Sequence, residues 1–176
     1  IETERLILRA PRIEDFEPFC AFLGSDRAQF VGGPVSDRPM LIRAFGHIAG
    51  LWLLRGYSCF VAEVRGQAGG IGFFGLWYPQ GWPEPEMSWS IWEPRLEGRG
   101  YATEAMRAAM PWSFSKAGIS SAISVVDAAN HSSRRLSETL GASIDADATL
   151  VANSPGSPFF DAEADHVVVY RHRRAA

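Results

Sequence analysis

Cysteine, lysine and long apolar runs are all scarce in this sequence of 176 residues. The two cysteines, Cys20 and Cys59, lack CxxC spacing, so we expect buried thiols in a reducing compartment rather than a disulfide. No apolar run approaches the roughly 18 residues that a membrane-spanning helix needs, and the first residues lack the layout of a signal peptide. These absences predict a cytoplasmic protein with no membrane partner.

An excess of positive charge is absent as well. The chain has 17 basic and 20 acidic residues, a net charge of −3, which argues against a nucleic acid as the main partner. Every basic residue except Lys116 is arginine, so an arginine is informative only through its position. A stretch over 142–165 holds no Lys or Arg, and it is either a solvated loop or a region that attracts a cationic amine; its acids are Asp145, Asp147, Asp161, Glu163 and Asp165.

Motifs for metal or serine-hydrolase chemistry are missing too. No GxSxG motif occurs, and the histidines show no HxxxH spacing; they are His47, His131, His166 and His172. We therefore predict no metal site.

The chain is long enough to bury a full core as a single domain over 1–176. Strands are predicted over 5–10, 57–64, 71–78, 87–92, 119–126 and 166–171. Helices are predicted over 13–23, from a Ser36 cap to a Gly56 stop, over 101–116 with a bend at Pro111, and over 132–140. This order predicts a mixed α/β domain.

Two glycine patterns compete as phosphate-binding loops. The run Gly70–Gly75 fits GxGxxG, but it follows a hairpin turn and continues into strand-forming residues, whereas a dinucleotide fingerprint must open a helix. The run Arg95–Ala102 does join a strand to a helix. Gly98 and Gly100 allow a tight turn there, and the first helical amides can bind an anion, with Arg99 adding charge; a ligand-free turn is the alternative.

The run RLEGRGYATEA resembles the (Q/R)xxGx(G/A) signature of the GNAT superfamily of acyl-CoA N-acyltransferases, through Arg95, Gly98 and Gly100. The segments IETERLILR, EMSWSIW and NHSSRRLSETLG are similar, in order, to the RimJ/RimL-like branch of ribosomal-protein N-acetyltransferases. The resemblance covers nearly the whole chain. It implies a GNAT-type single domain of the mixed α/β class, with a mostly antiparallel twisted sheet splayed between its fourth and fifth strands.

The same resemblance implies acetyl-CoA as the acyl donor, held in the gap between the splayed strands, and no metal. The expected cofactor-binding residues come from three segments: main-chain groups of Ile91 and Trp92; the turn with Arg95, Gly98, Arg99 and Gly100 and the first helical residues Tyr101, Ala102 and Thr103; and Asn130 and Ser133 opposite. Asn130 is also an ordinary helix cap, and the two roles are compatible.

Acyl transfer to an amine needs a base, an oxyanion site and a donor to the leaving thiolate. Glu86 matches the position of the acid that serves as base in many relatives; a solvated carboxylate is the alternative, and Glu84 could take the role instead. Ser137 stands where many relatives have a tyrosine, and either it or Ser133 could only hydrogen-bond the sulfur.

Two functions follow from these features. The first is an N-acetyltransferase that moves the acetyl group directly to a primary amine, a protein N-terminus or a small molecule, without a covalent enzyme intermediate. The second is a non-catalytic acyl-CoA-binding sensor or interaction domain of the same fold. The sequence leaves the acceptor open, and it is compatible with a monomer or a homodimer.

Overall fold

A computed structural model of the protein describes residues 1–162 and 166–174. The strands are β1 (Leu6–Arg9), β2 (Cys59–Val64), β3 (Gly70–Trp77), β4 (Glu86–Ile91), β5 (Ser121–Asp127), β6 (Ser143–Ile144) and β7 (Val167–Arg173). The α-helices are α1 (Phe16–Leu23), α2 (Arg38–Arg55), α3 (Tyr101–Ala117), α4 (His131–Thr139) and α5 (Ala146–Ala152). Single 3₁₀ turns occur at η1 (Ile13–Asp15), η2 (Asp26–Ala28) and η3 (Pro94–Leu96).

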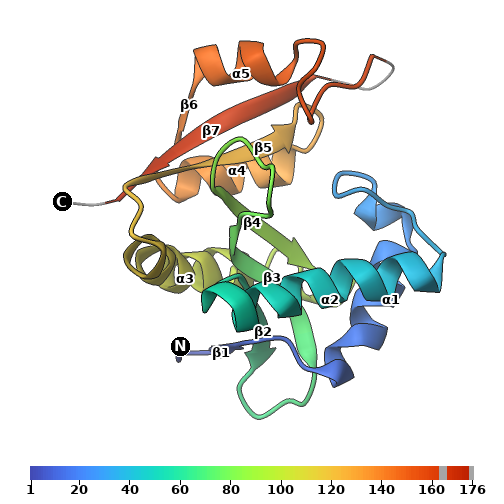
Figure 1. The fold of residues 1–176 in the computed structure, drawn as a ribbon. Coiled ribbons are helices and arrows are strands. Elements are labelled where there is room, and N and C mark those ends of the chain that lie inside the picture. Colours follow the sequence, from blue (N-terminus) through green and yellow to red (C-terminus); the bar gives the residue numbers. More distant parts are fainter. Residues whose placement is uncertain (163–165, 175–176) are drawn as a thin grey trace.

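The strands form one sheet in the order β1-β2-β3-β4-β5-β7-β6, and every pair is antiparallel except β4–β5. The parallel pair is joined at a single register position, Glu86 opposite Ile123, beyond which the two strands diverge. Figure 1 shows β4 lying between the N-terminal strands and the C-terminal group of β5, β6 and β7. The predicted mixed sheet, splayed between its fourth and fifth strands, is confirmed.

Two apolar cores cover opposite faces of the sheet. On one face, helices α1 and α2 pack phenylalanines from both helices against Phe73 and Trp92. On the other, α3 buries Ala105, Met106 and Ala109 against strand residues that include Met87. Adjacent side chains of a strand point to opposite faces, so the alternation read in β4 separates Met87, Trp89 and Ile91 from Glu86, Ser88, Ser90 and Trp92.

The C-terminal region differs from the sequence-based expectation. Part of the acidic stretch is ordered structure, because the Asp145 carboxylate caps α5 by accepting from the Ala148 amide at 3.0 Å and also binds Arg171 of β7. Glu163 and Asp165 lie outside the described residues. The cap of α2 is Asp37 rather than Ser36. Helix α3 includes Pro111 and ends at Ala117, one residue beyond the predicted bound.

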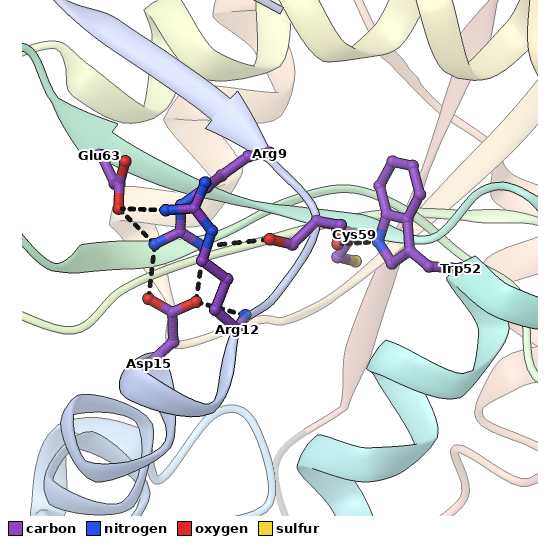
Figure 2. Close-up of polar contacts among 7 residues, drawn as sticks. Arg9, Arg12, Asp15, Trp52, Cys59 and Glu63 are labelled. Atoms are coloured by element: carbon purple, nitrogen blue, oxygen red, sulfur yellow. Dashed lines mark hydrogen bonds and ion pairs between the residues drawn. The ribbon is translucent and has the colours of Figure 1, made fainter.

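A buried ion cluster ties α1 to the N-terminal strands, as Figure 2 shows. Both guanidinium nitrogens Nη1 and Nη2 of Arg9 bind the fully buried carboxylate of Asp15, at 2.7 and 2.8 Å, and Nη2 also binds Glu63 of β2. The same carboxylate accepts from the Arg12 amide at 2.8 Å. One charged group thereby joins β1, β2 and the start of α1.

Candidate active site

The point where β4 and β5 separate forms a fork lined by main-chain groups. The Trp92 amide donates to the Ile71 carbonyl of β3 at 2.8 Å. Because N–H and C=O groups of successive residues alternate between the two edges of a strand, the main-chain groups of Trp89 and Ile91 face the fork. These groups lack a strand partner and can hydrogen-bond an extended ligand as a missing strand would.

A cleft of about 590 Å³ opens at this fork, which is a volume typical of small-molecule sites. It lies between the end of β4, the turn before α3, the start of α4 and the segment around η2. Seven of the predicted cofactor residues line it: Ile91, Gly98, Gly100, Ala102, Thr103, Asn130 and Ser133. The tertiary structure therefore brings together three segments that are far apart in the chain.

The N-terminus of α3 has unpaired amides at the cleft. Helices α2, α4 and α5 each begin with a side chain that accepts a backbone hydrogen bond, whereas α3 begins at Gly100 with no side-chain cap. The first helical N–H groups consequently remain available to an anion. Gly98 and Gly100 have φ values of 69° and 80°, a left-handed conformation that glycine adopts without strain. A glycine turn that opens an uncapped helix fits the diphosphate of coenzyme A.

Other predicted residues lie away from the cleft. The Trp92 side chain is buried against Phe73, and its carbonyl accepts from Arg27 at 2.6 Å, so both main-chain groups of Trp92 are already engaged. Arg95 is exposed and pairs with Glu93, and the Tyr101 ring packs in the core beneath Arg5. Arg99 is exposed, and its carbonyl accepts from Arg5 at 2.9 Å.

Two arginines that line the cleft, Arg27 and Arg135, were not predicted from the sequence. Arg27 of η2 donates to the carbonyls of Ile91, at 2.9 Å, and Trp92, and it binds the Glu97 carboxylate. Arg135 of α4 also lines the cleft, whereas its neighbour Arg134 contacts Ala128 and Tyr170 instead. Arg135 could have been found from the helical periodicity of α4, but no local pattern marks Arg27.

Glu86 sits at the base of the fork and has an unusual protonation equilibrium. Burial raises the pKa of Glu86 to about 7, and hydrogen bonds from the Trp82 indole and the Val125 main chain oppose that rise. The Trp82 Nε1 donates to the carboxylate at 2.8 Å. A carboxyl group with a pKa near neutrality can exchange a proton with an amine at physiological pH.

Asn130 and Ser133 occupy the opposite wall. The Asn130 side chain accepts from the Ser133 amide at 3.1 Å, which confirms the helix-cap role, and both residues line the cleft. The Ser133 hydroxyl accepts from the Trp89 indole at 3.2 Å. Ser137 is fully buried, and its hydroxyl donates to the Ser133 carbonyl at 3.0 Å, so it points away from the cleft.

The described residues hold neither a metal-binding cluster nor a membrane-spanning helix. Within residues 1–162 and 166–174, no cluster of three or more His, Cys, Asp or Glu side chains has a metal-binding arrangement. In the same residues, none of the helices has both the length and the apolar character needed to cross a bilayer.

Comparison with known proteins identifies the family. A model of the acetyltransferase (GNAT) domain matches residues 5–143. The solved structure of an acetyltransferase from Agrobacterium tumefaciens strain C58 is 30% identical, with 99% of this chain and 94% of that chain covered and a TM-score of 0.82. The chain therefore belongs to the GNAT acetyltransferase family, as its sequence motifs predict, and it is an acyl-CoA-dependent N-acetyltransferase.

More distant structures share the fold. An acetyltransferase of the GNAT family from Bacillus anthracis is 18% identical, with 98% of this chain and 97% of that chain covered and a TM-score of 0.73. A ribosomal-protein-S5-alanine acetyltransferase from Vibrio fischeri is 12% identical, with 99% and 96% covered and a TM-score of 0.74.

Proposed function

We propose that the protein transfers an acetyl group from acetyl-CoA directly to a primary amine, with Glu86 as the base and no covalent enzyme intermediate. The observation that supports this most strongly is that three features lie along one fork: an uncapped helix start, main-chain groups of Trp89 and Ile91 that have no strand partner, and a carboxyl group with a pKa near 7. Trp89 and Ile91 line the cleft, whereas Glu86 lies at the base of the fork, opposite Ile123. The helix start suits the diphosphate of coenzyme A, and the main-chain groups of Trp89 and Ile91 suit the amide-bearing pantetheine arm. The carboxyl group suits the incoming ammonium.

The chemistry divides between two side chains. Ionised Glu86 accepts a proton from the acceptor ammonium, directly or through water, and the neutral amine attacks the thioester carbonyl carbon. The C–S bond then breaks, the nitrogen of the adduct gives up its second proton to the departing thiolate, and the sulfur needs a hydrogen-bond donor as its charge develops. We assign that donor to Ser133 rather than Ser137, because the Ser133 hydroxyl lines the cleft while its oxygen already accepts from Trp89. Its hydrogen has no acceptor among the described residues, so it is free to bind sulfur.

The acceptor that we propose is the amine of a protein N-terminus, in the manner of the RimJ/RimL-like branch. The sequence similarity to that branch and the shared fold of the Vibrio fischeri enzyme support this class. A small-molecule amine is the alternative within the same chemistry. Mass spectrometry of acetylated products from a mixed panel of peptides and metabolite amines separates the two.

The test of catalysis is thiol release from acetyl-CoA over that amine panel. The wild-type rate is expected to rise as the pH passes about 7, because only ionised Glu86 can accept a proton. Glu86→Gln should lower kcat by about 10²- to 10⁴-fold and remove this pH dependence. The neighbouring Glu84→Gln is the control, since Glu84 pairs with Arg171 instead. An unchanged rate and pH profile in Glu86→Gln would exclude Glu86 as the base.

Thermal shift with CoA and acetyl-CoA tests the alternative of a binding module. Stabilisation by both ligands with no turnover on any acceptor would favour a non-catalytic acyl-CoA-binding domain. Stabilisation together with turnover supports the enzyme.

A further inference from the structure

The hydrogen-bond ladder between β4 and β5 stops abruptly at the base of the fork. The Ile123 amide donates to the Pro85 carbonyl at 2.8 Å, which is a regular parallel rung. Rungs of a parallel ladder repeat every second residue, so the next would join the Val125 amide to the Met87 carbonyl. The Met87 carbonyl instead accepts from a side chain, and the Val125 main chain interacts with a second one.

The first side chain is that of Ser124 on β5. Its buried hydroxyl donates to the Met87 carbonyl at 2.6 Å, which satisfies the acceptor that the missing rung would have used. A hydroxyl that reaches across from Cβ holds the two backbones farther apart than a direct N–H···O=C rung. The strands can therefore separate here without leaving a buried carbonyl unpaired, which would be costly.

The second is the carboxylate of Glu86. The Ile123 amide faces β4, so the Val125 amide, two residues further on, faces the same edge. A hydrogen bond from the Val125 main chain lowers the pKa of Glu86. The amide that the missing rung releases thus stabilises the ionised form of the proposed base. The opening of the fork and the placement of the base are consequences of the same change in hydrogen bonding.

His172 of β7 holds Ser124 in this role. The imidazole is 1% exposed, and its Nε2 lies 2.9 Å from the Ser124 hydroxyl oxygen. Because that hydroxyl donates its only hydrogen to Met87, the ring must donate from Nε2–H, which defines the tautomer. Burial lowers the pKa of His172 to about 4, so the ring is neutral, and its Nδ1 has no partner. Retaining a buried, half-satisfied imidazole costs stability, which indicates a role other than packing.

We propose that Ser124 and His172 are positioning residues that keep the fork open and aim the Val125 amide at Glu86. Neither touches the reacting atoms. The hydrogen bond to the Met87 carbonyl sets the width of the cleft. The Val125 amide, which that bond leaves free, interacts with the base Glu86. This inference rests on the proposed function of the fork.

The decisive measurement is the titration of Glu86 by NMR of ¹³C-labelled carboxyl groups, with Glu86→Gln used to assign the signal. Ser124→Ala removes the donor to Met87, so the Val125 amide can complete the rung and leave Glu86. The pKa of Glu86 should then rise above its wild-type value, because a hydrogen bond to the charged form is lost. The dissociation constant of CoA, measured by calorimetry, should increase about tenfold as the fork narrows.

Ser121→Ala is the matched control, since Ser121 is on the same strand and its hydroxyl accepts from Arg171 at 3.4 Å rather than binding β4. Ser124→Thr retains the hydroxyl and should keep the wild-type titration. If Ser124→Ala does not fold, His172→Gln, which keeps a donor, and His172→Phe, which lacks one, make the same comparison. A folded Ser124→Ala, or His172→Phe, with unchanged Glu86 titration and CoA affinity would overturn the proposal.

Different results would refute the proposed function and the positioning role of Ser124 and His172. A wild-type protein that binds no CoA or acetylates no amine would refute the proposed function. The Glu86 titration would still report on the fork in that case, because it requires neither ligand nor turnover.

Discussion

Burial of a single carboxyl group, Glu86, lowers the stability of the protein when the group is ionised, and it gives the proposed base a pKa near neutrality. Burial raises its pKa from 4.5 to about 7, so the folded protein binds this proton more tightly than the unfolded chain does. Its contribution to stability is therefore fully present below about pH 4.5 and is lost as the pH rises through about 7.

Glu86→Gln should accordingly stabilise the protein at alkaline pH while it lowers kcat. At pH 8 we expect the free energy of unfolding to increase by up to about 3 kcal/mol over the wild type, because glutamine carries no charge to bury. At pH 5 the difference should be small. Urea unfolding at the two pH values measures this, and an equal effect at both would show that the carboxylate is not destabilised by burial.

The two serines of α4 make a second residue-scale prediction. Ser133→Ala should lower kcat by about 10- to 100-fold, the value of one hydrogen bond to a charged group, with little change in the KM for the amine. Ser137→Ala should leave kcat near the wild-type value, because its hydroxyl is buried against the Ser133 carbonyl. Steady-state kinetics of the two variants decide which serine binds the thiolate. A lower kcat in Ser137→Ala, with an unchanged kcat in Ser133→Ala, would identify Ser137 as that donor.

At the scale of elements, Arg27 joins the η2 segment to the end of β4 and to the turn before α3. Its guanidinium binds two carbonyls and the Glu97 carboxylate, next to Gly98. Arg27→Ala should raise the KM for acetyl-CoA by about tenfold, because the turn loses its anchor and two carbonyls lose their donor.

Arg38→Ala is the control for this change, since that guanidinium forms an exposed pair with Glu17 on α1. Steady-state kinetics with acetyl-CoA varied measure the effect. A lower KM in Arg27→Ala would instead show that Arg27 competes with the substrate for the Ile91 carbonyl.

Long and strongly patterned elements could be predicted from the sequence. The alternation in β4 and the spacing in α3 reflect burial on one face, which local sequence records directly. The two-residue β6 and the seven-residue α5 are too short to show such a pattern. They depend on Asp145, which caps α5 and binds Arg171 from 26 positions along the chain.

For the whole molecule, the Arg9–Asp15 pair is the most buried of the ion pairs among the described residues, and it joins the N-terminal strands to α1 (Figure 2). Asp15→Ala should reduce the free energy of unfolding by about 3 kcal/mol, because it leaves a buried guanidinium with one partner fewer. Urea denaturation measures the change. Glu17→Ala, which breaks an exposed ion pair, should have little effect. Equal destabilisation in both variants would contradict the claim that breaking a buried ion pair costs more stability than breaking an exposed one.

The sequence by itself determined the family, the mixed sheet and seven of the residues that line the cleft, because a glycine turn before a helix and an asparagine before another are local features with local physical causes. Only the tertiary structure decided which groups face the ligand. It turned Ser133 inward and Ser137 away, engaged both main-chain groups of Trp92, and brought Arg27 to β4. It also opened the fork through Ser124, His172 and Glu86. These outcomes depend on hydrogen bonds between strands that are distant in the chain, and no local pattern encodes such pairings.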